Sequence, residues 1–172
     1  LVGPEKIIRG LAEKEGADLT GIQIVDTENN IASAEKAVLM CRVGEAEALM
    51  KGSLHTDELM RAAMSSANGI KSGRRVSHCY VMDVPAYGRP LLVTDAAINI
   101  APTLEEKVHI IQNAIDLAHI IGIPEPKVAI LSAVETINPK IQSTLDAAAL
   151  CKMADRGQIT GGLLDGPLAF DN

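Results

Sequence analysis

The sequence predicts a protein of the α/β class, and three observations support this prediction. Helix-like and strand-like segments alternate along the chain, as in folds that pack helices on a sheet. Hydrophobic residues make up 47% of the 172 residues, which is enough for one solid domain or two small ones. Aromatic residues make up only 2%, so the core must consist of Ala, Ile, Leu, Val and Met.

The first part of the chain follows the order helix, strand, helix, strand, helix. Ile7, Ile8 and Leu11 share one face of the first helix, and Gly16 suits its end. This alternation is typical of a parallel sheet covered by helices. The five predicted segments are residues 4–15, 22–25, 31–43 and 48–50 and a helix that begins at Thr56.

A loop at residues 68–73, which contains glycine and serine, separates this part from the next. We place the domain change just after it, so that the predicted domains are residues 1–75 and 76–172. Each is part of an α/β domain. After the boundary, strand-like runs at 76–82 and 90–94 flank a turn that contains proline and glycine. This pattern predicts a β-hairpin.

The strongest helix signal covers residues 103–121, where Thr103 and Glu106 have the spacing of a capping box. The continuous apolar run at 128–131 predicts a buried strand, and the polar Ser132 follows it directly. Ligands bind at such carboxyl ends of strands in open α/β sheets. Two further predicted elements are a helix over 143–155, with Ser143 as its N-cap, and a glycine-broken strand over 161–171.

Charge and cysteine usage exclude several classes of function. The formal net charge is −6, so the chain lacks the basic footprint of a nucleic-acid-binding protein. No apolar run is long enough to cross a membrane. Cys41, Cys79 and Cys151 are widely spaced, which fits reduced thiols better than disulfides or a metal site. We therefore expect a cytoplasmic protein that binds neither nucleic acid nor membranes.

The stretch from Lys51 to Arg61 combines a strand end, a glycine turn and a helix start, with Thr56 as the expected N-cap. Free N–H groups and the positive end of a helix make such a turn an anion site. The alternative is an ordinary strand–helix connection, because acidic residues at 57 and 58 already satisfy the helix dipole. The side chains that would add to an anion site are Lys51, Ser53, His55 and Arg61.

Two other groups of polar residues leave alternatives open. Asp95, Asp165 and Asp171 would hold a metal ion only if the fold brings them together, and we interpret them as turn and cap residues. We therefore predict no metal site. Arg74 and Arg75, at the domain change, either clamp a phosphate or form a solvated loop pair.

The histidines predict no metal site either. His109 and His119 lie on one predicted helix but ten residues apart, off a common face. We expect His78 to be a core histidine with its hydrogen bonds satisfied, whereas His55 is a candidate substrate contact. The chain contains neither a G-x-S-x-G elbow nor a G-x-G-x-x-G loop, so a hydrolase triad and a dinucleotide loop are unsupported.

Several runs of the sequence resemble the phosphate acetyl/butyryltransferase family, in the same order along the chain. Within the family, the sequence resembles the butyryl-type and short bifunctional members more than the classical acetyl-type enzymes. The runs that carry the resemblance cover most of the chain and are residues 47–56, 77–85, 94–102, 126–135, 146–159 and 165–172.

The resemblance implies a three-layer α/β/α fold similar to the isocitrate and isopropylmalate dehydrogenases, with two lobes around a cleft that holds the active site. It also implies a homodimer that converts acyl-CoA and phosphate into acyl phosphate and CoA. Coenzyme A is then a substrate, and no bound cofactor is expected. The alternatives are a non-catalytic substrate-binding or dimerisation fragment and an NAD(P)-dependent dehydrogenase of similar fold.

The resemblance also assigns substrate-binding residues. Lys51, Gly52, Ser53, His55 and Thr56 match the phosphate and acyl-phosphate turn of the family. A downstream arginine near the substrate matches Arg61. Two polar positions of the second domain match Asn99 and Ser132.

The sequence departs from the family in two places. Ala96 stands where classical acetyl-type enzymes have a cysteine, so we expect direct attack by the CoA sulfur instead of an acyl-cysteine. The aspartate proposed as the family's base lies in a segment after the position of Asn172. We therefore assign no catalytic residue in this chain and expect it to bind phosphate or acyl phosphate weakly and turn over poorly.

Overall fold

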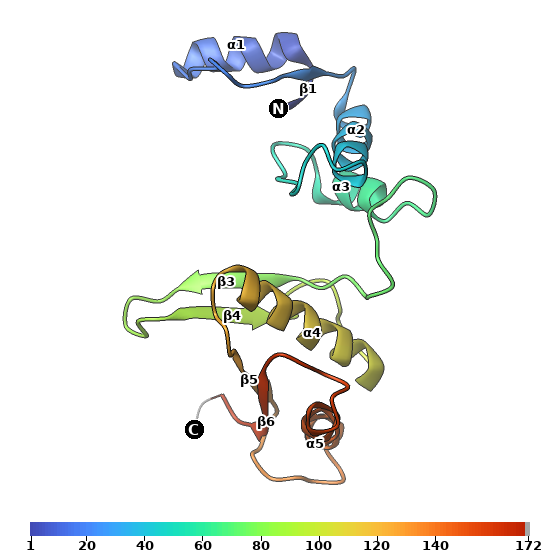
Figure 1. Ribbon diagram of the computed structural model, residues 1–172, viewed down its shortest axis with the longest axis vertical. Helices are drawn as coiled ribbons and strands as arrows, with labels where there is room; N and C mark the ends of the chain where they lie inside the picture. The colour runs from blue at the N-terminus through green and yellow to red at the C-terminus, as the bar shows by residue number, and fades with distance from the viewer. Residues whose placement is uncertain (171–172) are drawn as a thin grey trace. The chain divides into compact units, whose positions relative to one another are not determined.

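The computed structural model describes residues 1–170 and divides the chain into two compact units, Leu1–Gly73 and Arg74–Asn172. Both units contain helices and short strands (Figure 1). The α/β class predicted from the sequence is therefore confirmed. In the described residues the strands form three separate two-stranded sheets, not the continuous parallel sheet that the alternation predicted.

Unit 1 is built around helix α2. Its N-cap, Asn29, accepts a hydrogen bond from the Ala32 N–H, and its buried face carries Ala34 and Val38. Helices α2 and α3 lie side by side (Figure 1). The elements of unit 1 are β1 (Val2–Gly3), α1 (Glu5–Glu15), β2 (Val25–Asp26), α2 (Asn30–Arg42) and α3 (Thr56–Ala63), with β1 and β2 parallel.

Of the two strands predicted in unit 1, one does not form and the other is shorter than predicted. Residues 48–50 form no strand, and Met50 is 98% exposed. The run at 22–25 contributes only its last residue to β2. A short apolar run becomes a strand only when a neighbouring strand accepts its hydrogen bonds. No described residue pairs with residues 48–50.

Unit 2 begins with a hairpin, as predicted, and continues with two long helices and a parallel strand pair. Strands β3 (Cys79–Asp83) and β4 (Pro90–Thr94) are antiparallel. Helix α4 begins with the expected capping box, in which the Glu106 N–H donates to Thr103 Oγ1. The remaining elements are α4 (Leu104–Ile120), β5 (Lys127–Leu131), α5 (Gln142–Asp155) and β6 (Leu163–Leu168).

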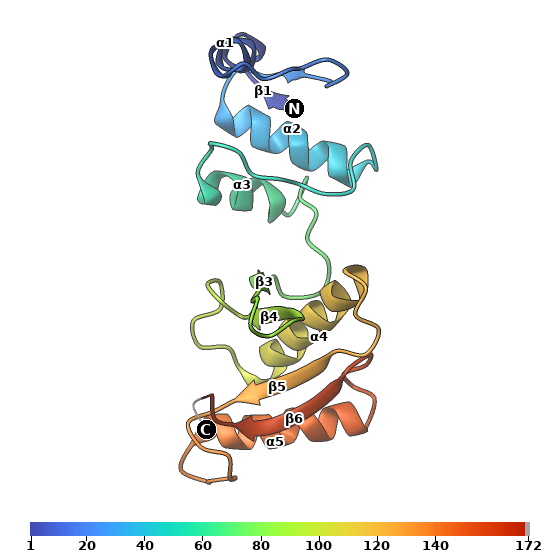
Figure 2. The same cartoon turned by 90° about the vertical axis from the view of Figure 1, so that its left-hand side faces the viewer.

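The core of unit 2 lies between α4, α5 and the β5–β6 pair. The two parallel strands run side by side and α5 packs along them (Figure 2). A partly buried ion pair at 2.5 Å between Lys107 Nζ and Asp146 Oδ2 joins α4 to α5. The fully or almost fully buried side chains at the centre are Ile111, Ile115, Leu150 and Ile159.

Two predictions for this unit are wrong. Strand β5 is not buried on both faces: Leu131, at its end, is 53% exposed. Helix α5 begins at Gln142 with Ile141 at the N-cap, so Ser143 lies inside the first turn. The hydroxyl group of Ser143 does not cap the helix, because it bonds to another side chain described below.

Candidate functional site

The turn at residues 51–56 is held by its own lysine. Lys51 Nζ donates to the carbonyl oxygens of Gly52 at 3.1 Å and Leu54 at 3.0 Å. The ammonium group therefore places a positive charge on the turn and fixes its backbone. Ser53 and Thr56 are exposed next to this charge.

Helix α3 starts at Thr56 and its N-cap is His55, so the predicted N-cap at Thr56 is wrong by one residue. The His55 N–H donates to Glu58 Oε2 at 2.9 Å. Within the described residues, the N–H groups of Thr56 and Asp57 have no hydrogen-bond acceptor. These two donors lie at the positive end of the helix.

The charged side chains near this helix start neutralise one another in part. Arg61 lies 3.7 Å from Asp57, and both side chains are more than 70% exposed. Such a pair contributes about 0–1 kcal/mol, so an anion can displace Asp57 from Arg61 at small cost. The turn thus combines main-chain N–H donors, a hydroxyl group and two cationic side chains.

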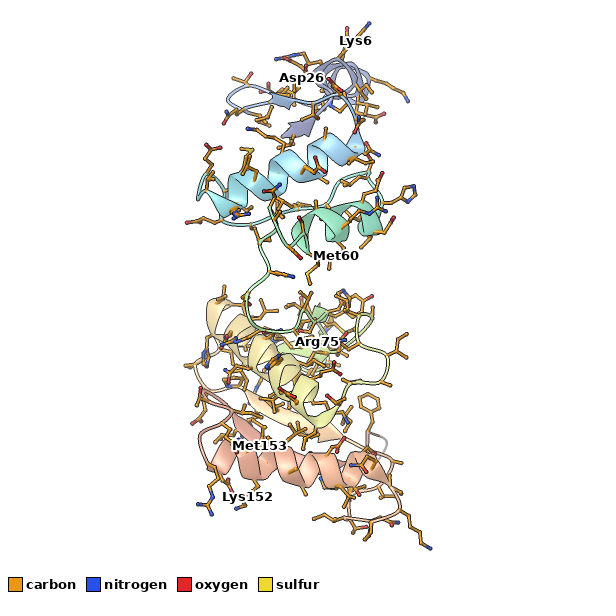
Figure 3. The ribbon with its side chains drawn as sticks, turned by 90° about the vertical axis from the view of Figure 1, so that its right-hand side faces the viewer. Lys6, Asp26, Met60, Arg75, Lys152 and Met153 are labelled. Atoms are coloured by element: carbon orange, nitrogen blue, oxygen red, sulfur yellow. The ribbon has the colours of Figure 1, made fainter. Side chains whose placement is uncertain are left out.

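Asn99, a predicted site residue of unit 2, belongs to a network around Arg75. Arg75 Nε donates to Asn99 Oδ1, and its guanidinium group pairs with Glu106 at 2.7 Å. The Arg75 main chain is held against α4, because its N–H donates to His109 Nδ1 at 3.0 Å and its carbonyl accepts from Asn113 at 2.9 Å. Figure 3 shows Arg75 beside α4.

These contacts decide between the two interpretations of the arginine pair. Arg74 forms an ion pair with Asp116, so neither arginine is simply solvated. The bond from Arg74, together with one from Gln112, lowers the pKa of Asp116 despite partial burial. Both guanidinium groups already have carboxylate partners, which argues against a phosphate clamp at this position.

Asn99 is a structural link in the same network. Its amide nitrogen donates to the Val76 carbonyl at 3.0 Å and to Asp95 Oδ2, so both of its N–H bonds are engaged. With Arg75 on its oxygen, Asn99 ties the start of the unit to the turn after β4. It has only acceptor capacity left for a substrate.

Asp95 is a turn aspartate, as interpreted from the sequence. Its Oδ1 accepts from the N–H groups of Ala97 and Ile98, each at 3.0 Å. Burial opposes its ionisation, but the hydrogen bond from Asn99 and those from the turn outweigh burial and lower the pKa of Asp95. Asp165 likewise accepts from the next N–H, that of Gly166, at 2.9 Å.

The third member of this set, Asp171, lies outside the described residues. Among residues 1–170, no three His, Cys, Asp or Glu side chains are grouped so as to hold a metal ion.

Ser132 follows β5, and its hydroxyl group lies 2.7 Å from that of Ser143 in the first turn of α5. Its N–H donates to the Leu168 carbonyl at the end of β6, at 2.8 Å. Sequence reasoning missed Ser143 as its partner and assigned that side chain to a cap. The available signal was a second serine close to the start of the helix that follows Ser132.

The histidines outside the turn have structural contacts. His109 accepts from Arg75, and His119 Nε2 lies 2.8 Å from the Gly161 carbonyl. His78 is half-buried and packs edge-on against Tyr80, with ring centroids 4.6 Å apart. Its Nδ1 is buried and has no partner in the described residues, so the expected fully bonded core histidine is wrong.

A profile of the family described as phosphate acetyl/butaryl transferase matches residues 2–172. The chain belongs to this family. It is 60% identical over its whole length to a phosphate acetyltransferase of Rhizobium meliloti, covering 54% of that protein. It is 44% identical to the phosphate butyryltransferase of Clostridium acetobutylicum, covering 57% of it. The chain thus spans about half the length of these relatives.

Relatives named as acetyltransferases and as butyryltransferases thus both match the chain. Among solved structures, a branched-chain phosphotransacylase from Enterococcus faecalis matches 87% of the chain and 53% of that protein, with a TM-score of 0.75 and 33% identity. A phosphotransacetylase from Staphylococcus aureus matches 99% of the chain with a TM-score of 0.74. At 16% identity, this second likeness concerns the fold alone.

No helix in the described residues has the length and apolar character needed to span a bilayer.

Proposed function

We propose that this chain is part of an acyltransferase that interconverts acyl-CoA plus phosphate and acyl phosphate plus CoA. The observation that carries the proposal is the family match over residues 2–172, together with 60% identity to a phosphate acetyltransferase. Coenzyme A takes part as a substrate, and the proposed reaction needs no resident cofactor.

Three finer features are part of this proposal. The intact protein adopts the layered α/β/α architecture of the isocitrate and isopropylmalate dehydrogenases, with two lobes. It works as a homodimer, and it is cytoplasmic. The free thiols of Cys41, Cys79 and Cys151 support a reducing compartment.

In unit 1, the turn at residues 51–56 binds the phosphate group. The N–H groups of Thr56 and Asp57 and the hydroxyl group of Ser53 are donors without acceptors of their own in the described chain. Lys51 and Arg61 supply positive charge. The helix start adds its dipole, which favours a bound anion by about 0.3–1 kcal/mol at an exposed position. His55 is exposed beside the turn and contacts the substrate.

In unit 2, Ser132 donates a hydrogen bond to an oxygen of the acyl phosphate. Its hydroxyl group is half-buried and its main chain is fixed to β6. Asn99 acts through the turn that it holds, and its remaining acceptor capacity serves an N–H or O–H group of CoA and not a phosphate oxygen.

The proposed chemical step is a direct acyl transfer. The CoA sulfur attacks the acyl carbon, the carbon–sulfur bond forms, and the bond from carbon to the phosphate oxygen breaks, while the thiol proton passes to a base. Ala96 has no nucleophilic atom, so the geometry offers no acyl-enzyme at that position. The described residues assist by orienting the substrate and stabilising charge on the departing phosphate.

The proposal is tested by mixing the protein with acetyl phosphate and CoA and following thioester formation by absorbance. Butyryl phosphate is run in parallel, and calorimetric titrations measure binding of phosphate, acetyl phosphate and NAD. We expect weak but saturable binding of acetyl phosphate, slow thioester formation that needs both substrates, and no heat with NAD. Saturable binding of NAD with none of acetyl phosphate would instead favour a dehydrogenase of similar fold.

A further inference from the structure

The connection between β5 and α5 holds two serine hydroxyl groups in contact. Ser132 Oγ and Ser143 Oγ are 2.7 Å apart, and both residues are half-buried. The main chain of Ser132 is anchored by its N–H bond to the Leu168 carbonyl at 2.8 Å. One serine therefore sits at a fixed strand end and the other on a helix.

A buried threonine makes this arrangement rigid. Thr144 is fully buried, and its hydroxyl group accepts from the Asn138 N–H at 2.9 Å and lies 2.8 Å from the Ile141 carbonyl. The connection that separates the two serines is thereby tied to the first turn of α5. The geometry of the pair is set by a main-chain bond at Ser132 and by the Thr144 side chain next to Ser143, as a preorganised site requires.

Helix α5 is in turn fixed to α4. Asp146 accepts from Lys107 at 2.5 Å and from Gln142 at 2.8 Å, and only a tenth of its side chain is exposed. Ser143 lies between Gln142 and the buried Thr144 in the sequence, so its position is set by contacts that do not involve Ser132.

Counting protons gives the pair a direction. Each hydroxyl group carries one proton, and the bond between them uses one, so one proton is left for a ligand. A phosphate or acyl oxygen only accepts, so Ser132 donates to it and must receive the bond from Ser143. Hydrogen bonds in such a chain strengthen one another. The positive end of α5 favours the same direction of donation, from Ser143 to Ser132.

We propose that Ser143 is a positioning residue that orients the Ser132 hydroxyl group toward an oxygen of the acyl phosphate. This inference rests on the proposed function, because it needs Ser132 to contact that substrate. Ser143 itself does not touch the ligand. It fixes the direction in which Ser132 donates.

The test is a titration of the isotope-labelled chain with acetyl phosphate, followed by amide NMR spectra, for wild type and four variants. We expect Ser132→Ala to bind about tenfold more weakly and Ser143→Ala about threefold more weakly. The double variant should match Ser132→Ala alone, since Ser143 acts only through Ser132. Ser143→Thr, which keeps the hydroxyl group, should restore most of the affinity.

A matched control comes from another hydroxyl pair. Thr27 Oγ1 and Ser33 Oγ are also 2.7 Å apart, and neither residue belongs to the proposed site. Thr27→Val removes one hydroxyl group from that pair and should leave the affinity for acetyl phosphate unchanged. A loss of affinity in this variant would reveal a general effect of breaking such pairs and would overturn the positioning role.

The remaining outcomes separate the two proposals. Wild-type affinity in Ser143→Ala, with weakened binding in Ser132→Ala, would overturn the positioning role and leave the proposed function standing. Multiplied losses in the double variant would also overturn it, because they would mean that Ser143 acts independently. If the wild type shows no saturable binding of acetyl phosphate, the proposed function fails and the positioning role fails with it.

Discussion

The candidate site residues of the two units are held in different ways. In unit 1, the 51–56 turn offers main-chain N–H groups and exposed side chains at the start of the eight-residue helix α3. In unit 2, Asn99 and Ser132 are tied into hydrogen-bond networks anchored on the 17-residue helix α4 and the 14-residue helix α5. The turn in unit 1 can adapt to an anion, whereas the networks in unit 2 fix the directions in which Asn99 and Ser132 form hydrogen bonds. The proposed function therefore relies on the backbone in one unit and on side-chain contacts in the other.

The same contrast extends to the cores. The buried hydrophobic side chains of unit 1 are Ala34 and Val38, whereas unit 2 has a cluster around Ile115 and Leu150. Helix α1 leaves Ile7 60% and Leu11 55% exposed. More buried apolar volume in unit 2 supports the more rigid site.

The largest expected effect is therefore a core truncation in unit 2. Leu150 is fully buried, and Leu150→Ala should lower the free energy of unfolding by about 2–5 kcal/mol through lost burial and a cavity. Val38→Ala removes fewer atoms and should cost less. Urea denaturation, followed by circular dichroism and by amide signals from each unit, measures both. If Val38→Ala lost more free energy of unfolding than Leu150→Ala, unit 1 and not unit 2 would have the more strongly stabilising core.

The next effect concerns the ion pair between α4 and α5. Lys107→Ala leaves Asp146 without its cationic partner and should destabilise unit 2 by about 1–3 kcal/mol, between the limits for exposed and buried pairs. Burial opposes ionisation of Asp146, but the bonds from Lys107 and Gln142 outweigh burial and hold its pKa below the ordinary value.

A carboxyl group with a lowered pKa in the folded state contributes stability above its unfolded pKa, and this stability is lost as pH falls through the folded pKa. The stability of the wild type should therefore fall below about pH 4, and Asp146→Asn should reduce that dependence. Melting temperatures measured between pH 7 and pH 3 test this. An unchanged acid dependence in Asp146→Asn would show that other carboxyl groups control it.

Much of the fold is readable from the sequence where local signals are strong. The capping box of Thr103 and Glu106, the hairpin turn and the start of α3 all depend on residues close to one another in the chain. Whether residues 48–50 form a strand, and how far the faces of β5 are buried, depends on which other strands lie nearby. A local sequence pattern carries no such information.

The candidate sites follow the same division. The 51–56 turn is continuous in sequence, so its donors are predictable from glycine and helix-start signals. The full engagement of Asn99 depends on Arg75 and Val76, more than 20 positions away. The partnership of Ser132 with Ser143 depends on how an irregular connection folds back, for which no periodicity exists.

A moderate effect is expected at the phosphate turn. Ser53→Ala removes a hydroxyl donor to a charged ligand and should weaken phosphate binding about three- to tenfold. Because Ser53 is exposed and has no partner in the described chain, the melting temperature should stay unchanged. Calorimetric titration with phosphate at two salt concentrations measures the affinity. Ser66→Ala is the control, since it removes an exposed hydroxyl group three residues beyond the end of α3, where Lys71 Nζ lies at 3.5 Å.

The sharpest test of a main-chain site, with little expected effect on stability, is Gly52→Ala. A methyl group at Gly52 meets no atom within 4 Å, and its φ angle is not in the left-handed region, so folding should change by less than about 0.5 kcal/mol. Phosphate binding should still weaken, because the methyl group stands where an anion approaches the backbone. Gly69→Ala is the opposite case, since its methyl group would lie 2.3 Å from the Ala63 carbonyl oxygen and must destabilise unit 1. Full phosphate affinity in folded Gly52→Ala would place the anion away from this backbone and leave unit 2 as the better candidate.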